Sequence, residues 1–233
     1  MARALIITSP GTLTTPAGPQ LAPSTINADP AVHVRAARIP TTAEPVLIAP
    51  SVSGASALLA PSAGFAPSVV EDTTGRRVLR FDGVDDVMRI DPLTGPAPST
   101  VVMVATLRRA PGDFDTVGCF HTIGVNAPDL TRWPDGTLSL YAGTRLTGPQ
   151  LGTGRHVIAA VLNGASSRIT VDGSTVTGDA GGTTAANGYN IGTQRGTSVR
   201  AAIDVDALIV FARALTGAEV AAEVAALRAE FGV

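Results

Sequence analysis

The chain has 233 residues, a formal net charge of −2 and 17 basic residues, all of them arginine. The arginines are scattered singly or in pairs, so the sequence lacks the basic patch of a nucleic-acid-binding protein. Charged residues make up 15% of the chain, against about 25% in an ordinary soluble domain. The 25 glycines and 17 prolines mark many turns, which favours short strands over long helices.

Cys119 is the single cysteine, which excludes an intramolecular disulfide and a cysteine-based zinc cluster. The first apolar run, Leu5–Ile7, is short, whereas a signal peptide needs about 7–15 apolar residues and a membrane span about 18 or more. We therefore expect neither an export signal nor a membrane segment.

Residues 1–43 are predicted to form an extended arm. Their repeated prolines interrupt any helix, and the alternation in Val32–Ala36 predicts one short edge strand. Apolar residues such as Leu5 and Ile26 are costly to leave in water. We therefore expect the arm to lie along its own domain or along a neighbouring subunit, the alternative being a flexible leader, and we expect residues 44–233 to form one domain.

From residue 46 onward, short runs typical of strands alternate with turn signals. The apolar run Thr100–Leu107 is typical of a central strand buried on both faces, and the alternation in Thr137–Tyr141 and Arg168–Val171 predicts half-buried strands. The other predicted strands are Val46–Ile48, Arg77–Phe81, Val87–Ile90, Cys119–Ile123, His156–Leu162, Tyr189–Ile191 and Ala201–Phe211. About ten strands without intervening helices predict an antiparallel sandwich or barrel.

One amphipathic helix is predicted at the end of the sequence. Thr216 followed three residues later by Glu219 is the pattern of a capping box, in which each side chain bonds the other residue's backbone N–H. Apolar residues then recur on one helical face, at Val220, Val224, Leu227 and Phe231. This face is expected to pack on the sandwich.

The segment Arg80–Asp86, Arg-Phe-Asp-Gly-Val-Asp-Asp, followed by a strand, resembles the entry motif of laminin-G-like (concanavalin A-like) jelly-roll domains. Other pieces follow in the order of that family: Gly154–Ala159, Ile169–Gly173, Asn190–Gly192 and Asp206–Glu219. The last piece resembles the closing strand and capped helix of the bacterial and phage branch. Over residues 44–233 the resemblance implies an all-β, concanavalin A-like antiparallel jelly-roll sandwich, with an extended N-terminal arm and a short C-terminal helix.

The sequence lacks the catalytic pattern of a glycan hydrolase, although two of its acids, Asp204 and Asp206, can be weighed as catalytic carboxylates. The resemblance implies that a hydrolase of this fold would carry a strand with the pattern Glu-x-Asp-x-x-Glu, and this chain has no such strand. Asp204 and Asp206 are spaced for one strand face, but no glutamate follows them there, and we expect them to be strand-face acids. Asp113 and Asp115 are expected to be turn formers. The sequence has no Gly-x-Ser-x-Gly motif and no recognisable triad around its three histidines, so no catalytic residue is assigned.

A calcium ion is the metal that the resemblance implies, held at a loop rim by carboxylates and backbone carbonyls. The densest cluster of acids is Asp82, Asp85 and Asp86. In the alternative interpretation, Asp82 forms a tight turn with the following glycine and the other two acids cap the next strand.

A glycan site would use a rim aromatic as a stacking surface and amides for the sugar hydroxyls. Trp133 precedes a Pro-Asp-Gly turn and is expected at a loop tip, and Tyr189 is expected in a similar place, between Asn187 and Asn190. These four residues are the predicted carbohydrate-binding set. The alternative for each aromatic is a core or loop-anchoring role.

The resemblance and the missing catalytic acids predict a non-enzymatic virion structural protein, a phage tail or capsid component. It would dock through its arm on other virion proteins and on copies of itself. One alternative is a lectin module that binds cell-surface glycans, and another is a glycan hydrolase. We expect no nucleic acid or membrane partner and no cofactor, apart from the calcium named above.

Overall fold

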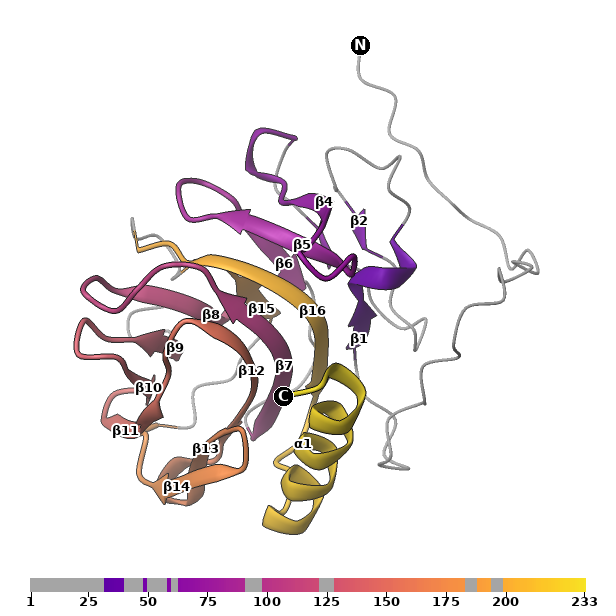
Figure 1. Ribbon diagram of the computed structural model, residues 1–233. Coiled ribbons are helices and arrows are strands. Elements are labelled where there is room, and N and C mark those ends of the chain that lie inside the picture. The colour runs from indigo at the N-terminus through magenta and orange to yellow at the C-terminus, as the bar shows by residue number, and fades with distance from the viewer. Residues whose placement is uncertain are drawn as a thin grey trace.

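The computed structural model describes residues 32–39, 48–49, 58–59, 63–90, 98–121, 128–182, 188–193 and 199–233. Within these ranges the strands form two antiparallel sheets packed face to face, and one α-helix follows them (Figure 1). The predicted all-β sandwich with a C-terminal helix is confirmed. In the described residues, no helix is long and apolar enough to cross a membrane.

The first sheet, called sheet A, runs in the order β14-β13-β12-β7-β16-β5-β4, with β1 also paired to β16. Its central strand β16 pairs with β7 along one side, and on the other side with β5 and then β1. The strands are β1 (Val32–Arg35), β4 (Ser68–Glu71), β5 (Arg77–Asp82), β7 (Ser99–Leu107), β12 (Gly154–Leu162), β13 (Ser167–Val171), β14 (Ser174–Gly178) and β16 (Ala202–Phe211).

The second sheet, called sheet B, runs in the order β11-β10-β9-β8-β15-β6-β3-β2. Its strands are β2 (Ile48–Ala49), β3 (Leu58–Leu59), β6 (Met88–Ile90), β8 (Asp115–His121), β9 (Asp129–Arg132), β10 (Thr137–Tyr141), β11 (Arg145–Gln150) and β15 (Gly188–Ile191). Three short 3-10 turns accompany the sheets: η1 (Ala36–Arg38), η2 (Ala63–Phe65) and η3 (Gly164–Ser166).

Strand β7 shows why the longest apolar run of the sequence is continuous. Met103 and Leu107 point between the two sheets and belong to the main core, whereas Val102 and Val104 point outward. The outward residues are covered by the helix α1 (Gly217–Phe231), which lies across the outside of sheet A (Figure 1). Both faces of β7 are therefore buried, as the sequence predicted.

The predicted capping box of α1 is confirmed. The Glu219 backbone N–H donates to Thr216 Oγ1 at 3.2 Å, and the Thr216 backbone N–H donates to Glu219 Oε2 at 2.7 Å. The Arg213 guanidinium holds the Glu219 carboxylate from outside, at 2.7 Å. The helix ends at Gly232, whose φ of 71° is the left-handed conformation that favours glycine.

The predicted strand near residue 32 is also confirmed, and it lies along its own domain. Val34 pairs with Leu208 of β16, and Val34, Ala36 and Ile39 are each only 1% exposed within the main core. Residues 32–39 were assigned to the arm, but their apolar side chains complete the core of the domain. Residues 1–31 lie outside the described part.

Candidate functional site

The two acids weighed as catalytic carboxylates are both held by arginines on the outer side of sheet A. Asp204 accepts hydrogen bonds from Arg80 Nε and Nη2 at 2.8 and 2.7 Å, and pairs with Arg108 at 3.1 Å. Asp206 sits at a bulge of β16, pairs with Arg155 at 3.2 Å, and has its pKa raised to about 6 by burial. These contacts suit structural acids.

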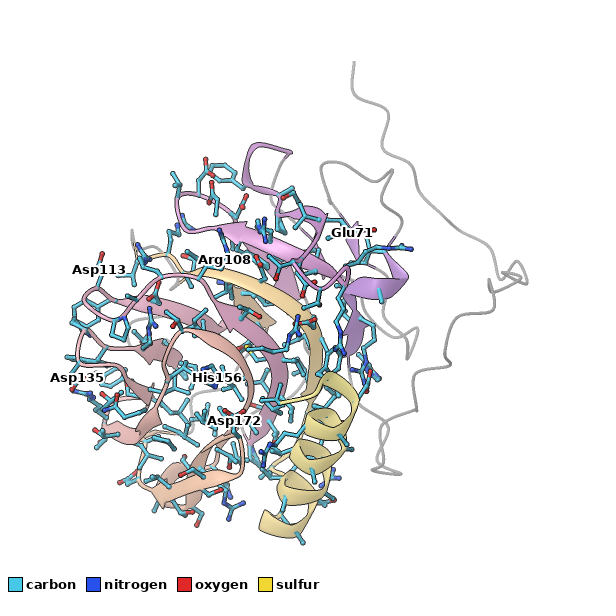
Figure 2. All side chains as sticks on the ribbon, viewed as in Figure 1. Glu71, Arg108, Asp113, Asp135, His156 and Asp172 are labelled. Atoms are coloured by element: carbon cyan, nitrogen blue, oxygen red, sulfur yellow. The ribbon has the colours of Figure 1, made fainter. Side chains whose placement is uncertain are left out.

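Asp115 is not the turn former that the sequence predicted. It is the first residue of β8, is 1% exposed, and pairs with Arg132 and, at 2.6 Å, with Arg109. The neighbouring Asp113 does lie in the exposed turn before β8 (Figure 2). The prediction for Asp115 was wrong because the partner that draws it inward, Arg132, lies 17 residues further along the chain.

The structure brings Asp82, Asp85 and Asp86 together, with one carboxylate oxygen of each within 4.8 Å of the others. Asp82 Oδ1 accepts from the Val84 backbone N–H at 2.7 Å, and Asp86 Oδ2 accepts from the Asp82 N–H at 2.8 Å. Burial, and then the other two acids, raise the pKa of Asp86. The turn interpretation and the calcium interpretation therefore use the same three residues, and calcium stays a prediction.

Tyr189 does not lie at a loop tip. It belongs to β15, is 0% exposed, and its ring lies across Gly118 of β8 in the main core. Its neighbour Asn190 points to the outer side of sheet B but is only 5% exposed. The period of two in a strand places these neighbours on opposite faces, so the predicted rim position of Tyr189 is wrong. Asn187 lies outside the described residues.

Trp133 does lie at the start of a turn, as predicted. Its backbone N–H and C=O bond Thr137 and Gly136 at 2.8 Å each, which closes the turn between β9 and β10. The side chain is half-buried, and its indole N–H donates to Ser139 Oγ at 2.7 Å. The turn and the indole bond together fix the orientation of the ring.

Two further side chains complete a cluster around this ring. Phe114 contacts Trp133 edge to face, with ring centroids 4.9 Å apart, and the Arg145 guanidinium lies 3.6 Å from the Trp133 centroid. Phe114 is 37% exposed and Arg145 is exposed. We call Phe114, Trp133 and Arg145 the aromatic cluster.

The aromatic cluster has polar neighbours that suit a sugar. The Asp135 carboxylate lies in the same turn, where it accepts from the Thr137 backbone and hydroxyl at 2.9 and 2.6 Å (Figure 2). Those hydrogen bonds lower the pKa of Asp135, so this carboxylate is charged at neutral pH. One signal in the sequence could have identified Phe114, because it is an aromatic residue inside a Pro-Gly-Asp-Phe-Asp segment, whereas no signal marks Arg145.

No protein-family model matches the sequence, and no curated protein gives a significant match. Solved structures do match. Trypanosoma rangeli sialidase in complex with sialic acid gives a TM-score of 0.62 at 12% identity, over 85% of this chain and 33% of that chain. This chain therefore spans about a third of the sialidase.

Two other matches are bacterial. Domain 4 of AbnA, a GH43 extracellular arabinanase from Geobacillus stearothermophilus, in complex with arabinotriose, gives a TM-score of 0.61 at 13% identity, over 84% of this chain and 98% of that chain. The ligand binding domain of Botulinum neurotoxin serotype D in complex with N-acetylneuraminic acid gives 0.61 at 8% identity, over 84% and 50%. At these identities the matches establish the fold, which is the concanavalin A-like β-sandwich.

Proposed function

We propose that this chain is a non-enzymatic, lectin-like module that binds a glycan at the aromatic cluster. The observation that carries the proposal is the Phe114–Trp133 pair at the rim of the sandwich. Only Phe65, Val84 and Phe114 are large apolar side chains exposed in the described residues, and of these Phe114 contacts a second aromatic ring. An exposed aromatic ring beside charged and hydroxyl groups suits the apolar face and the hydroxyls of a sugar.

The comparisons support a glycan over other ligands. The arabinanase domain was solved with arabinotriose, the sialidase with sialic acid and the neurotoxin domain with N-acetylneuraminic acid. These ligands belong to those proteins, and a shared fold does not carry a ligand from one chain to another. They do make arabinotriose and N-acetylneuraminic acid the first probes to test.

The absence of catalysis is part of the same proposal. Glycan hydrolysis uses two carboxyl groups that are free to act as acid, base or nucleophile. Asp204 and Asp206, the pair that the sequence offered, are 4% and 3% exposed and are each engaged by arginines. Their geometry supports a binding module over a hydrolase.

The test is a glycan array followed by calorimetric titration of each glycan that binds. Phe114→Ala removes half of the ring pair without touching the indole hydrogen bond, and we expect it to weaken binding by about tenfold or more. Phe65→Ala is the matched control, because Phe65 is 41% exposed and lies in η2. Equal affinities for the wild type and Phe114→Ala would place the glycan elsewhere and contradict the proposal.

The role as a phage tail or capsid component stays a prediction. It rests on the resemblance of Arg80–Asp86 and the later segments to laminin-G-like domains, and of Asp206–Glu219 to the end of their bacterial and phage branch. A lectin-like module carried on a virion would combine both interpretations, with the glycan on the surface of the host cell. The oligomeric state of the full chain, treated in the Discussion, tests the assembly part of this prediction.

A further inference from the structure

A groove lies between α1 and the hairpin of β13 and β14 on the outer side of sheet A. Its volume is about 150 Å³. Gly217, Ala221 and Ala225, spaced by one helical turn, face this gap from α1. Their small size keeps the groove open, while Val220 and Val224 form its apolar floor.

Two arginines flank the groove, one on the hairpin and one on the helix. The Arg168 guanidinium lies flat against Gly217. Its central carbon and both terminal nitrogens are 3.6–3.7 Å from the position that a Cβ on Gly217 would take. For Arg228 a single guanidinium nitrogen, Nη1, lies 3.6 Å from the position that a Cβ on Gly173 of the hairpin turn would take. Flat stacking leaves the N–H edges of a guanidinium available to a ligand.

In the described part of the chain, neither arginine forms an ion pair with the side chain of an aspartate or a glutamate. Arg168 Nε donates to Thr177 Oγ1, a neutral acceptor, at 3.4 Å, and Arg228 Nε donates to the main-chain oxygen of Val233 at 3.2 Å. No acidic side chain lines the groove. The glutamates of α1 point elsewhere: Glu219 pairs with Arg213, Glu230 pairs with Arg35, and Glu223 is 1% exposed.

We propose that this groove binds an acidic oligosaccharide, whose carboxylate or sulfate groups lie against Arg168 and Arg228. The inference rests on the proposed glycan-binding function and adds a second subsite with a stated ligand class. Gly217, beside Arg168, and Arg228 are 11 positions apart on α1, about 16 Å of helix at 1.5 Å per residue. Two cations along one groove match a chain of acidic sugars better than a single small anion.

The groove offers the rest of what such a ligand needs. Guanidinium groups bind carboxylate and sulfate oxygens through paired N–H donors. The Thr170 and Thr175 hydroxyls, which bond each other at 2.9 Å, lie on the hairpin wall of the groove. The apolar floor can pack against the carbon face of a sugar ring.

The experiment is calorimetric titration of the full chain with trigalacturonate at low ionic strength. Its methyl ester is the neutral counterpart, and inorganic sulfate is the free-oxyanion probe. Arg168→Gln and Arg228→Gln are each expected to weaken trigalacturonate binding by about tenfold. Arg200→Gln, which removes the same charge away from the groove, is the matched control and should bind as the wild type does.

A third variant distinguishes binding inside the groove from general electrostatic attraction to the two arginines. Ala221→Phe fills the gap without changing the charge, and Ala221 is exposed, so the fold should tolerate it. We expect it to abolish trigalacturonate binding. Wild-type affinity in Ala221→Phe, or in the Arg168→Gln/Arg228→Gln double variant, would overturn the proposal.

The remaining outcomes distinguish this subsite from the aromatic cluster. Loss of glycan binding in Phe114→Ala, with no effect of the groove variants, would overturn the groove and keep the proposed function. Failure of every acidic and neutral glycan to bind the wild type would overturn both. If sulfate bound as tightly as trigalacturonate, the groove would be a site for free oxyanions, and the proposal of an oligosaccharide ligand would be overturned.

Discussion

Arg132 and Asp115 form an ion pair whose side chains are 0% and 2% exposed. The pair joins β9 to β8, and Arg132 Nη2 also donates to the Arg109 carbonyl at 2.8 Å. Arg109 closes the arrangement by pairing with Asp115 from the solvent side at 2.6 Å. This buried charge network lies directly beside Phe114, so it holds one side of the aromatic cluster in place.

Asp115→Ala is expected to destabilise the fold by about 3–5 kcal/mol, because it leaves the buried Arg132 guanidinium without its counter-charge. Urea unfolding measures the effect. Asp113→Ala is the control from the same loop: its side chain is 69% exposed and reaches Arg109 only at 3.9 Å. Its effect should stay within about 0.5 kcal/mol. Similar losses in both variants would show that Asp115 acts only through the turn.

Asp113 and Asp115 also show which kind of feature could not be predicted from the sequence. Both stand in one Pro-Gly-Asp-Phe-Asp segment, and composition alone made both turn formers. The alternation of strands and the capping box depend on neighbours in the sequence, so Thr137–Tyr141 and the N-terminus of α1 were predicted at their observed positions. The burial of Asp115 depends on a distant arginine, and no local pattern records it.

Two of the strands that the sequence did not predict share a physical reason. β11 and β14 lie at the ends of their sheets, and most of their side chains face solvent. An edge strand needs few apolar residues and tolerates proline, and β11 contains Pro149. The hydrophobic periodicity that marks a central strand such as β7 is therefore weak in them. Of the three residues of the aromatic cluster, the sequence predicted only Trp133. Arg145 was missed for the same reason, because it belongs to β11.

Asp206→Asn is expected to stabilise the protein at neutral pH. The unfolded carboxyl titrates near 3.8, and burial raises its folded pKa to about 6. The folded state therefore binds more protons than the unfolded state between these values, and wild-type stability falls as the pH rises from about 4 to about 6. The shift corresponds to about 3 kcal/mol.

The measurement is the urea midpoint of the wild type and Asp206→Asn across this pH range. The advantage of the variant should grow from about pH 4 to about pH 6 and then stay constant. Arg155 keeps its ion pair with Asp72 in the variant, so no buried cation is left alone. A pH-independent difference between the two proteins would rule out Asp206 as the titrating group.

Thr216→Ala is expected to destabilise the fold by about 1 kcal/mol, because it removes the acceptor for the Glu219 backbone N–H. Thr216→Ser keeps the hydroxyl and should stay close to the wild type. Thermal unfolding followed by circular dichroism compares the three proteins. A loss in the serine variant as large as that in the alanine variant would assign the effect to the lost methyl group.

Truncation at two positions tests both the boundary of the arm and the predicted assembly. Removal of residues 1–31 keeps β1, whereas removal of residues 1–40 also takes away Val34 and Ile39, each 1% exposed, and the ion pair of Arg35 with Glu230 at 3.2 Å. Full burial of one such apolar side chain contributes about 1.5–3 kcal/mol. The longer deletion is therefore expected to lower the free energy of unfolding by several kcal/mol relative to the shorter one.

Light scattering on the full chain and on residues 32–233 then tests the predicted docking arm. An oligomer that becomes a monomer when residues 1–31 are removed would support an assembly role, and a full chain that is already monomeric would contradict self-association through the arm. The shorter deletion is the one to interpret. Loss of β1 exposes the edge of β16 and part of the core, so a change of mass after the longer deletion would mix lost docking with non-native association.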